Sequence, residues 1–323
     1  MNDQFKKIVL EATGAEELFE IQKIQDLWSG YGVIARYGLV GSNIQSVVLK
    51  HIQLPDKDSH PRGWNTDISH QRKLKSYDVE VAWYKNWSAQ CKQNAYVPDC
   101  FAVDTRDNET LIVLEDLCST GFEILRNTVS LEEMKVCIRW LADFHATYMG
   151  QRADDLWQNG TYWHLGTRPD ELEALKDLPL KKAASQIDQL LRNSPFKTFV
   201  HGDAKLANFC FSADGQKVAA VDFQYVGAGC GMKDLAYFIG SCLDEEECER
   251  FVDVLLSYYF NILQDALKAK SSEVDFIALE KNWRHLFPVA WTDFHRFIKG
   301  WSPGHWKINS YSERLAREVV AAL

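Results

Sequence analysis

The feature of this sequence that most restricts its fold is a polar segment followed by a short hairpin. The polar segment runs from His201 to Asn208 and reads His-Gly-Asp-Ala-Lys-Leu-Ala-Asn. Two apolar runs then flank an Asp-Gly turn at Gly215, which is a strong hairpin signal because glycine adopts positive φ without strain. Asp222 ends the second run, as far after Gly215 as Asn208 is before it. Antiparallel pairing is therefore expected to bring Asn208 and Asp222 to the same end of the hairpin.

This end of the hairpin has the donor chemistry of a magnesium site. Asn208 supplies an amide oxygen, Asp222 supplies a carboxylate, and a second carboxylate stands nearby in the sequence at Asp203. Hard oxygen donors of this kind are those that Mg²⁺ prefers. The alternative is a polar turn in which Asp and Asn only cap the backbone. The spacing, taken together with the hairpin, favours a functional site.

The same residues resemble the motif of the kinase-like phosphotransferases, which include the choline, aminoglycoside and ecdysteroid-type kinases. Their pattern is Asp-x4-Asn followed by Asp-Phe at a strand end, and it is matched here by Asp203, Asn208 and Asp222-Phe223. The resemblance implies that Asp203 accepts the proton of the substrate hydroxyl. It also implies that Asn208 and Asp222 hold the magnesium ions on ATP.

Two neighbours of Asp203 refine this resemblance. Lys205 matches the protein-kinase loop, whose lysine neutralises the transferring phosphate. Protein kinases usually have arginine where Gly202 stands, so glycine here is the form found in small-molecule kinases. The short interval between Asp222 and Lys233 also leaves no room for a long peptide-binding activation segment. We therefore expect a small-molecule kinase rather than a protein kinase.

The N-terminal part of the chain reads as an antiparallel sheet with helices. Helical spacing predicts a short helix over 3–13, and three extended runs separated by turns follow between Phe19 and Ile52. A second hairpin over 97–114 completes five strands. The resemblance implies an α+β, protein-kinase-like bilobal fold with a five-stranded antiparallel sheet in the N-lobe and a mainly helical C-lobe.

Candidate nucleotide contacts lie in this N-lobe. The third strand ends its apolar run with Lys50, which the resemblance assigns to the phosphates of ATP. A helix predicted over 77–87 carries Glu80, the best candidate to pair with that lysine. Gly30 and Gly32 lie in the turn before the second strand, where backbone N–H groups could approach phosphate. The alternative for the two glycines is a simple hairpin turn. Residues 53–70, between the Lys50 strand and the Glu80 helix, are expected to form a loop.

An apolar strand that ends in Glu115-Asp116-Leu117 resembles the connector between the lobes of ecdysteroid-kinase-like proteins. In that family, backbone groups of the connector bind the adenine, which implies a cofactor-binding role for Glu115 and Leu117. The border between the lobes would fall here. Residues 1–117 would form the nucleotide-binding N-lobe, and 118–323 the C-lobe with the catalytic loop, the metal site and the acceptor site.

The C-lobe holds two further polar residues of interest. Asp234 opens a helix within Lys-Asp-Leu-Ala, and the resemblance implies that its carboxylate braces the backbone of the catalytic loop. The alternative for Asp234 is a helix cap. His145 lies on the apolar stripe of a helix predicted over 131–148. We expect His145 to be a packed, hydrogen-bonded side chain rather than a catalytic one.

Tryptophan is frequent in the C-lobe segments that bind the phosphate acceptor in related kinases. Trp163, Trp301 and Trp306 stand in irregular, polar-flanked sequence, which favours a pocket wall over the core position usual for large aromatic residues. Choline-type kinases enclose a cation with such rings, whereas ecdysteroid-type kinases take uncharged, steroid-like alcohols. The connector and the segment 72–77 resemble the second group. We favour a bulky apolar alcohol as acceptor, with choline-like amino alcohols or aminoglycosides as alternatives.

Composition is compatible with this assignment. The 323 residues suffice for two lobes, and a net charge of −9 argues against a general nucleic-acid binder. The eight cysteines form no Cys-x-x-Cys pair and are expected to be reduced thiols. Neither a signal peptide nor a run long enough to span a bilayer is apparent, so we expect a cytoplasmic protein without a membrane partner. The oligomeric state is left open.

Taken together, these patterns predict an ATP- and Mg²⁺-dependent phosphotransferase that acts on a hydroxyl of a small molecule. The rival hypothesis is a nucleotide-binding scaffold without catalysis, a pseudokinase. Degenerate kinases usually lose at least one of the three central polar residues. Asp203, Asn208 and Asp222 are all present, which favours the enzyme.

Overall fold

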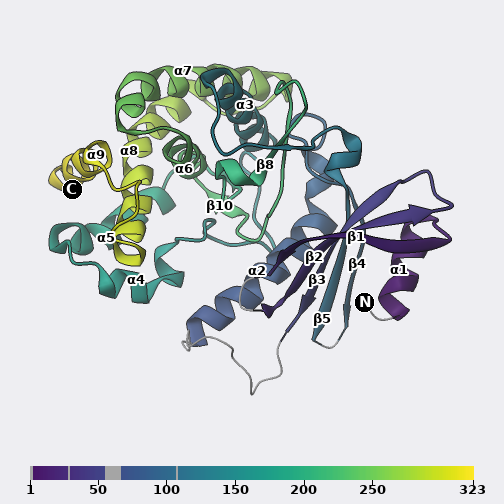
Figure 1. Cartoon of the computed structure of the whole chain (residues 1–323). Coiled ribbons are helices and arrows are strands. Elements are labelled where there is room, and N and C mark those ends of the chain that lie inside the picture. Colours follow the sequence, from purple (N-terminus) through teal and green to yellow (C-terminus); the bar gives the residue numbers. More distant parts are fainter. Residues whose placement is uncertain (1–2, 28–29, 55–66, 107) are drawn as a thin grey trace.

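Five antiparallel strands and the helices around them form the N-terminal region of the computed structural model, which describes residues 3–27, 30–54, 67–106 and 108–323 (Figure 1). The sheet order is β1-β2-β3-β5-β4. The strands are β1 (Glu17–Asp26), β2 (Gly32–Val40), β3 (Ser46–Gln53), β4 (Cys100–Arg106) and β5 (Glu109–Glu115). The predicted five-stranded antiparallel sheet is confirmed.

Two helices, α1 (Asp3–Thr13) and α2 (Asp67–Asn86), flank this sheet (Figure 1). Side chains alternate between the two faces of a strand, so Val47 and Leu49 of β3 pack in one cluster with α1. Lys50 therefore points to the opposite face, where α2 lies. The alternation along β3 thus presents its lysine to the helix that carries Glu80.

Helix α2 is longer than predicted. The sequence predicts a helix over 77–87 after a loop over 53–70, but residues 67–70 already belong to α2, and 55–66 lie outside the described residues. The first turns of α2 carry few apolar residues, so helical periodicity is weak there. Contacts with other parts of the fold hold them instead: the Tyr31 hydroxyl hydrogen-bonds His70 at 2.8 Å, and Arg72 donates to the Thr167 carbonyl at 2.6 Å.

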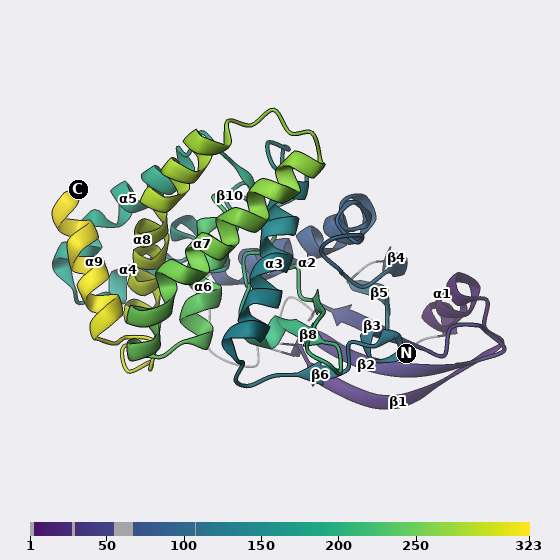
Figure 2. The same ribbon diagram turned by 90° about the horizontal axis from the view of Figure 1, so that it is seen from above.

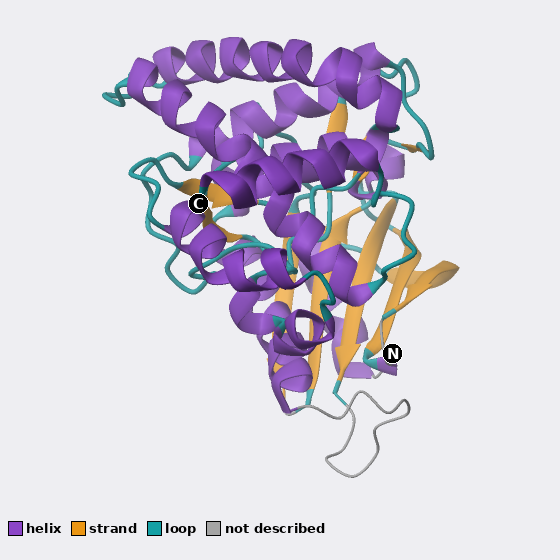
Figure 3. Cartoon of the chain, turned by 90° about the vertical axis from the view of Figure 1, so that its left-hand side faces the viewer, coloured by secondary structure: helices purple, strands orange, loops and turns teal. Residues whose placement is uncertain are grey.

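The C-terminal region is mainly helical, as predicted, and it lies beside the large sheet (Figure 3). Its α-helices are α3 (Leu131–Thr147), α4 (Pro169–Ala174), α5 (Leu178–Arg192), α6 (Met232–Cys242), α7 (Glu245–Ala269), α8 (Phe276–Trp301) and α9 (Ser310–Ala322). Seen from above, α3 and α7 pack side by side, and α9 lies at the end away from the sheet (Figure 2). Helix α5 begins at Leu178 and includes Pro179 in its first turn, where proline is tolerated.

Short strands and 3-10 helices complete the C-terminal region. The short strands are β6 (Ile124–Leu125), β7 (Thr198–Val200), β8 (Phe209–Phe211), β9 (Val218–Ala220) and β10 (Gly227–Gly229). They form a three-stranded sheet, β6-β8-β9, and a pair, β10-β7. The 3-10 helix η3 (Leu117–Thr120) follows the large sheet, and the lobe border expected at residue 117 falls at its start and stays a prediction.

A continuous apolar core joins α2 to the helical region. The indole of Trp83 on α2 stacks on the ring of Phe223, with centroids 4.5 Å apart and an interplanar angle of 16°. The same indole contacts Phe144 of α3 at 5.8 Å. Because Phe223 directly follows Asp222, this stacking fixes α2 beside the hairpin that carries the predicted metal ligand.

Two further sequence predictions concern the whole chain. The eight cysteines are free thiols, as expected. Among the helices that the structure describes, none combines the length and the apolarity needed to cross a bilayer.

Candidate active site

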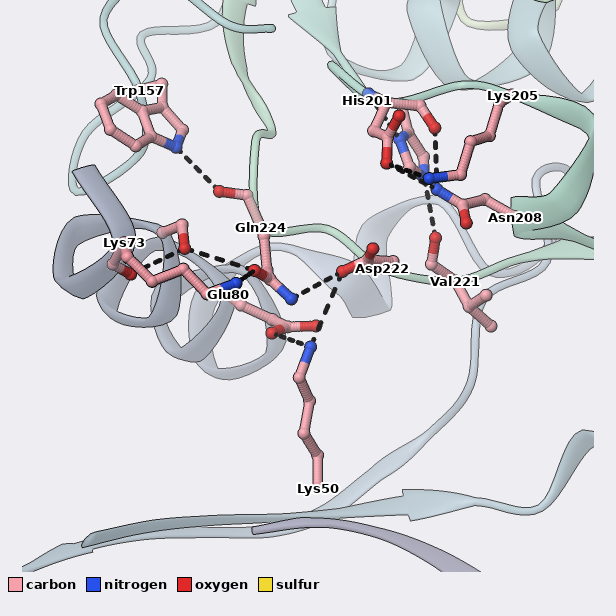
Figure 4. Close-up of polar contacts among 12 residues, drawn as sticks. Lys50, Lys73, Glu80, Trp157, His201, Lys205, Asn208, Val221, Asp222 and Gln224 are labelled. Carbon is pink, nitrogen blue, oxygen red and sulfur yellow. Dashed lines mark hydrogen bonds and ion pairs between the residues drawn. The ribbon is translucent and has the colours of Figure 1, made fainter. Parts of the chain in front are cut away.

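The hairpin predicted after Asn208 is formed by β8 and β9. Phe209 pairs with Ala220, and the carbonyl of Asn208 accepts a hydrogen bond from the Val221 N–H at 3.0 Å. Asn208 therefore lies opposite Val221, one residue from the symmetric pairing that the sequence suggested. Asn208 and Asp222 still lie at the same end of the hairpin (Figure 4).

Asp203 is a buried carboxylate with three side-chain partners. The ammonium of Lys205 lies 2.9 Å from its Oδ2, and the amide nitrogen of Asn208 donates to the same oxygen at 3.2 Å. The hydroxyl of Tyr237 donates to Oδ1 at 3.2 Å. Burial raises the pKa of Asp203, and Lys205 opposes that rise. A held carboxylate with a raised pKa has the character of a general base.

Backbone geometry before Asp203 requires a glycine. Gly202 has φ 81°, and a Cβ at this position would stand 2.2 Å from the carbonyl oxygen of Tyr225. The carboxylate of Asp234 accepts hydrogen bonds from the N–H of His201 at 2.5 Å and of Gly202 at 2.9 Å. Asp234 thus holds the backbone of this turn, and the residue at the N-cap of α6 is Gly231 instead.

The two histidines near this turn are fully buried and hydrogen-bonded. Nδ1 of His201 accepts from the Asp203 N–H at 3.2 Å, so its Nε2 carries the proton and donates to the Val221 carbonyl at 3.0 Å. His145 lies 2.7 Å from the Tyr259 hydroxyl and 3.2 Å from Asp234. The prediction that His145 is a packed, hydrogen-bonded side chain is confirmed.

Lys50 lies between two carboxylates. Its ammonium is 2.6 Å from Glu80 and 3.6 Å from Asp222 (Figure 4). Burial works against the charge of Lys50, but the two carboxylates outweigh it and raise the pKa of the lysine. Burial would likewise raise the pKa of Asp222, yet attraction by Lys50, Lys205 and Lys73 lowers it. Burial raises the pKa of Asp203 and of Glu80, so Asp222 is the one of these three carboxylates that stays ionised most readily.

The backbone of Asp222 is strained. Its φ of 68° lies in the left-handed region, which is uncommon for residues other than glycine. Residues held in such a conformation cluster at functional sites, where surrounding contacts enforce it. The contacts here include the stacking of the next residue, Phe223, on Trp83, with ring centroids 4.5 Å apart.

Gln224 and Lys73 belong to the same cluster and were missed by the sequence reasoning. The Gln224 amide donates to Asp222 at 2.9 Å, and its oxygen accepts from Lys73 at 3.0 Å and from Ser76 at 3.3 Å (Figure 4). Burial lowers the pKa of Lys73 to about 8, and repulsion by Lys50 adds to this effect. Lys73 stands seven positions before Glu80, so helical periodicity places both on one face of α2. This spacing could have identified Lys73, but the helix predicted over 77–87 begins after Lys73 and so does not include it.

The donor set at the hairpin fits magnesium. Both hydrogen bonds from the Asn208 side chain to Asp203 use the amide nitrogen, which leaves the amide oxygen available beside the Asp222 carboxylate. Across the described ranges, no three or more His, Cys, Asp or Glu side chains are arranged as a metal cage. A kinase-type Mg²⁺ needs no such cage, because phosphates and water complete its shell.

The glycines of the first turn have a structural role of their own. In this turn, the Leu27 N–H donates to the Gly32 carbonyl at 2.9 Å. A Cβ at Gly32 would stand 2.0 Å from the carbonyl oxygen of His51, so close packing against β3 requires glycine. Gly30 has φ 75° and open space around it, which leaves its position accessible for the predicted phosphate contact.

Side chains of the connector anchor it from both sides. Glu115 accepts from the Tyr96 hydroxyl at 2.7 Å and from the Asp99 N–H at 2.9 Å. Asp116 accepts from Arg36 at 2.8 Å and from Ser46 at 2.7 Å. The connector is thus held by its acidic side chains, which accounts for the Glu-Asp pair without any ligand.

The three tryptophans selected from the sequence lie in different surroundings. Trp163 is fully buried, contacts Tyr237 at 4.8 Å between ring centroids, and donates to Asp293 at 3.1 Å. Trp301 is 46% exposed and borders a separate hollow with Arg72. Trp306 is 56% exposed. Trp163 adjoins the tyrosine that donates to Asp203.

Sequence comparison relates the chain to a family of kinases. The profile of the ecdysteroid kinase-like family matches residues 71–159 and 149–271. A search of curated proteins found no matching sequence. The first match covers α2 from residue 71 onward and the connector, and the second covers the turn at Asp203, the hairpin and α6.

Solved structures of small-molecule kinases share the fold. The amicoumacin kinase hAmiN, solved with AMP-PNP, Ca²⁺ and Ami, has a TM-score of 0.56 at 13% identity, over 99% of this chain and 94% of that chain. The choline kinase LicA from Streptococcus pneumoniae has a TM-score of 0.52 at 12% identity, over 99% and 100%. A microcompartment-associated aminopropanol kinase has a TM-score of 0.51 at 12% identity, over 99% and 94%. At such identities the likeness shows the kinase-like fold.

Proposed function

This chain belongs to the ecdysteroid kinase-like family, and from that premise we propose that it transfers the terminal phosphoryl group of ATP to a hydroxyl of a small molecule. The observation that carries the proposal is the meeting of two polar clusters at one hairpin. One is Lys50 with Glu80 and Asp222, and the other is Asp203 with Lys205 and Asn208. The cluster around Lys50 has charges suited to holding a metal-bound nucleotide. The cluster around Asp203 contains the candidate general base, Asp203 itself.

The acceptor hydroxyl would lose its proton to Asp203. The pKa of this carboxylate is raised by burial, which improves its strength as a base near neutral pH. Lys205, 2.9 Å from the same carboxylate, is placed to neutralise charge on the transferring phosphoryl group. Its contact with Asp203 would be exchanged for one with the phosphoryl oxygens as the reaction proceeds.

Asn208 and Asp222 would hold Mg²⁺ through the amide oxygen and the carboxylate. Bound Mg²⁺ supplies positive charge on the phosphate oxygens. Lys50 would contact the phosphates, and Glu80 would fix the direction of the Lys50 side chain. Lys73, held by Gln224 at 3.0 Å, adds a cation beside the same carboxylates. Catalysis in this scheme is positioning and electrostatics, as phosphoryl transfer requires.

The nucleotide would enter from the N-lobe, residues 1–117, and the acceptor from the C-lobe, 118–323. We assign the backbone between Glu115 and Leu117 to the adenine, and the turn with Gly30 and Gly32 to the phosphates. For the acceptor we favour a bulky, largely apolar alcohol. Aromatic side chains pack around Tyr237 beside Asp203, which suits an apolar substrate. The free cysteines favour a reducing compartment such as the cytoplasm.

Phosphate transfer to a panel of alcohols tests this proposal. Purified protein would be incubated with ATP and Mg²⁺ and with sterol-like and polycyclic alcohols, amino alcohols or aminoglycosides. The expected result is ADP release together with a phosphate ester visible by ³¹P NMR, absent in the Asp203→Asn variant. Binding of ATP·Mg²⁺ without ester formation from any alcohol would overturn the kinase proposal and favour a nucleotide-binding scaffold without catalysis.

A further inference from the structure

The ammonium of Lys307 is surrounded by aromatic rings. It lies 4.7 Å from the ring centroid of Tyr237, 5.4 Å from that of Phe294 and 5.5 Å from that of Trp306. The rings come from α6, from α8 and from the segment between α8 and α9. We call Tyr237, Phe294 and Trp306 the aromatic cage. Within the residues that the structure describes, the ammonium has no carboxylate within ion-pairing distance.

The aromatic cage adjoins the candidate catalytic base. Tyr237 is one wall of the cage, and its hydroxyl donates to Asp203 at 3.2 Å. The ammonium of Lys307 is close enough to the catalytic-base candidate to interact with it electrostatically: Asp203 attracts the ammonium, and Lys205 repels it. Burial lowers the pKa of Lys307 to about 8, because the ammonium has lost much of its water. This costly placement of a charge is offset by the ring faces.

Three ring faces within about 6 Å of one positive charge form the arrangement by which proteins recognise quaternary ammonium ligands. Here the protein's own ammonium stands in that position. A trimethylammonium group could enter only after displacing the Lys307 side chain, and it would meet repulsion from a like charge during entry. A neutral alcohol meets no such repulsion on its way to Asp203.

We propose that Lys307 is a built-in cation that fills the aromatic cage beside Asp203, so that the site rejects quaternary amino alcohols and takes uncharged ones. The choice between charged and uncharged alcohols as acceptors rests on the proposed function. The occupancy of the aromatic cage by Lys307 does not depend on catalysis. Lys307 thereby acts as a specificity-determining residue. With Lys307 in place the aromatic cage is closed to organic cations, and without it the cage would be open to them.

Calorimetric titration with choline and with tetramethylammonium tests whether the cage is filled. The wild type is expected to bind neither, whereas Lys307→Ala should bind both at least about tenfold more tightly than the wild type. Lys307→Arg keeps a cation in the cage and should behave as the wild type. Lys281→Ala, which removes an exposed lysine of α8, controls for overall charge.

A second variant separates the cage from simple loss of repulsion. In the Lys307→Ala background, Trp306→Ala removes one wall and should abolish the gained affinity for tetramethylammonium. A gain that survives loss of this wall, a wild type that binds choline as tightly as Lys307→Ala, or a Lys307→Ala variant that folds but gains nothing would each overturn the inference.

Turnover measurements keep this result distinct from the proposed function. ADP release by the wild type with neutral alcohols, and none with choline, supports both. Failure of every alcohol would remove the kinase assignment, while the titrations would still decide whether Lys307 fills the cage. Choline turnover by the wild type would overturn the inference and leave the kinase assignment standing.

Discussion

The ammonium of Lys50 lies 3.6 Å from the carboxylate of Asp222, so one ion pair joins the large sheet to the candidate catalytic hairpin. The same ammonium lies 2.6 Å from Glu80 on α2. Three elements distant in sequence therefore meet at one charge. This meeting supports the proposal that Asp222 faces the nucleotide, whereas Asp203 contacts Lys205, Asn208 and Tyr237 instead.

The two aspartates are expected to separate nucleotide binding from turnover. Asp222→Ala should abolish Mg²⁺-dependent binding of ATP, because it removes the proposed metal ligand and a partner of Lys50. Asp203→Asn should retain ATP binding and lose turnover, because an amide cannot accept the hydroxyl proton. Calorimetric titration of ATP·Mg²⁺ into each variant checks this division, and an equal loss of affinity in both would refute it.

Lys205 is expected to act on the rate and not on the nucleotide. Lys205→Ala should lower kcat by about a hundredfold, the usual effect of removing one preorganised charge contact from a transition state. ATP affinity should change little, since the contact strengthens mainly in the transition state. Steady-state kinetics with varied ATP would show this split. A variant with wild-type kcat would mean that Lys205 only pairs with Asp203.

Lys73 is expected to cost stability near neutral pH. Its pKa in the folded state, about 8, lies below the ordinary 10.5, so between these values the unfolded chain binds more protons. The penalty is therefore present below pH 8 and is lost as the pH rises towards 10.5. Lys73→Met should raise the free energy of unfolding by about 1–3 kcal/mol at pH 7.

Urea unfolding at pH 7 and at pH 9.5 measures that effect. The advantage of Lys73→Met over the wild type should shrink at the higher pH, and the same variant should bind ATP·Mg²⁺ more weakly. Lys281→Met, at an exposed position of α8, serves as the matched control and should show no such dependence. A pH-independent loss of stability in Lys73→Met would contradict the buried-charge explanation.

Gly202 and Gly121 offer a matched pair of variants for testing the turn before Asp203. Both have positive φ, 81° and 93°, but only at Gly202 would a Cβ strike another atom, the Tyr225 carbonyl oxygen at 2.2 Å. Gly121→Ala should cost about 1 kcal/mol from backbone strain alone. Gly202→Ala should cost more and should also reduce kcat, because the backbone before Asp203 must shift. Thermal unfolding measures the stability of the two variants, and ADP release measures their kcat. Equal losses of stability and of kcat in Gly202→Ala and Gly121→Ala would contradict this expectation.

Local signals in the sequence were enough to predict the hairpin at the centre of the candidate site. The Asp-Gly turn and the spacing around it predicted the hairpin that brings Asn208 and Asp222 to one end. The sheet followed from three extended runs and a hairpin, and the bilobal fold from the resemblance of the motif. The anchor of α2 on the hairpin did not follow, because stacking of Trp83 on Phe223 is a contact between distant segments.

Residues that reach the site from afar were missed for the same reason. Tyr237 and Lys307 are separated by two helices in the sequence, and nothing in either segment shows that a hydroxyl meets Asp203 or that an ammonium meets three rings. The selection of Trp306 from polar-flanked sequence did pick one wall of the aromatic cage. Its role in the acceptor site stays a prediction, as do those of Trp163 and Trp301.

The stacking of Trp83 on Phe223 has a regulatory consequence. Swinging α2 outward would expose buried rings at a cost of about 1.5–3 kcal/mol for a Phe ring and more for the larger Trp. We infer that the Lys50–Glu80 pair is permanently assembled, without an inactive state in which the helix is displaced. Amide hydrogen exchange of α2 should then be equally slow with and without ATP·Mg²⁺, and faster exchange in the free protein would contradict this. For the proposed kinase, control would then fall to its synthesis and to the supply of the acceptor alcohol.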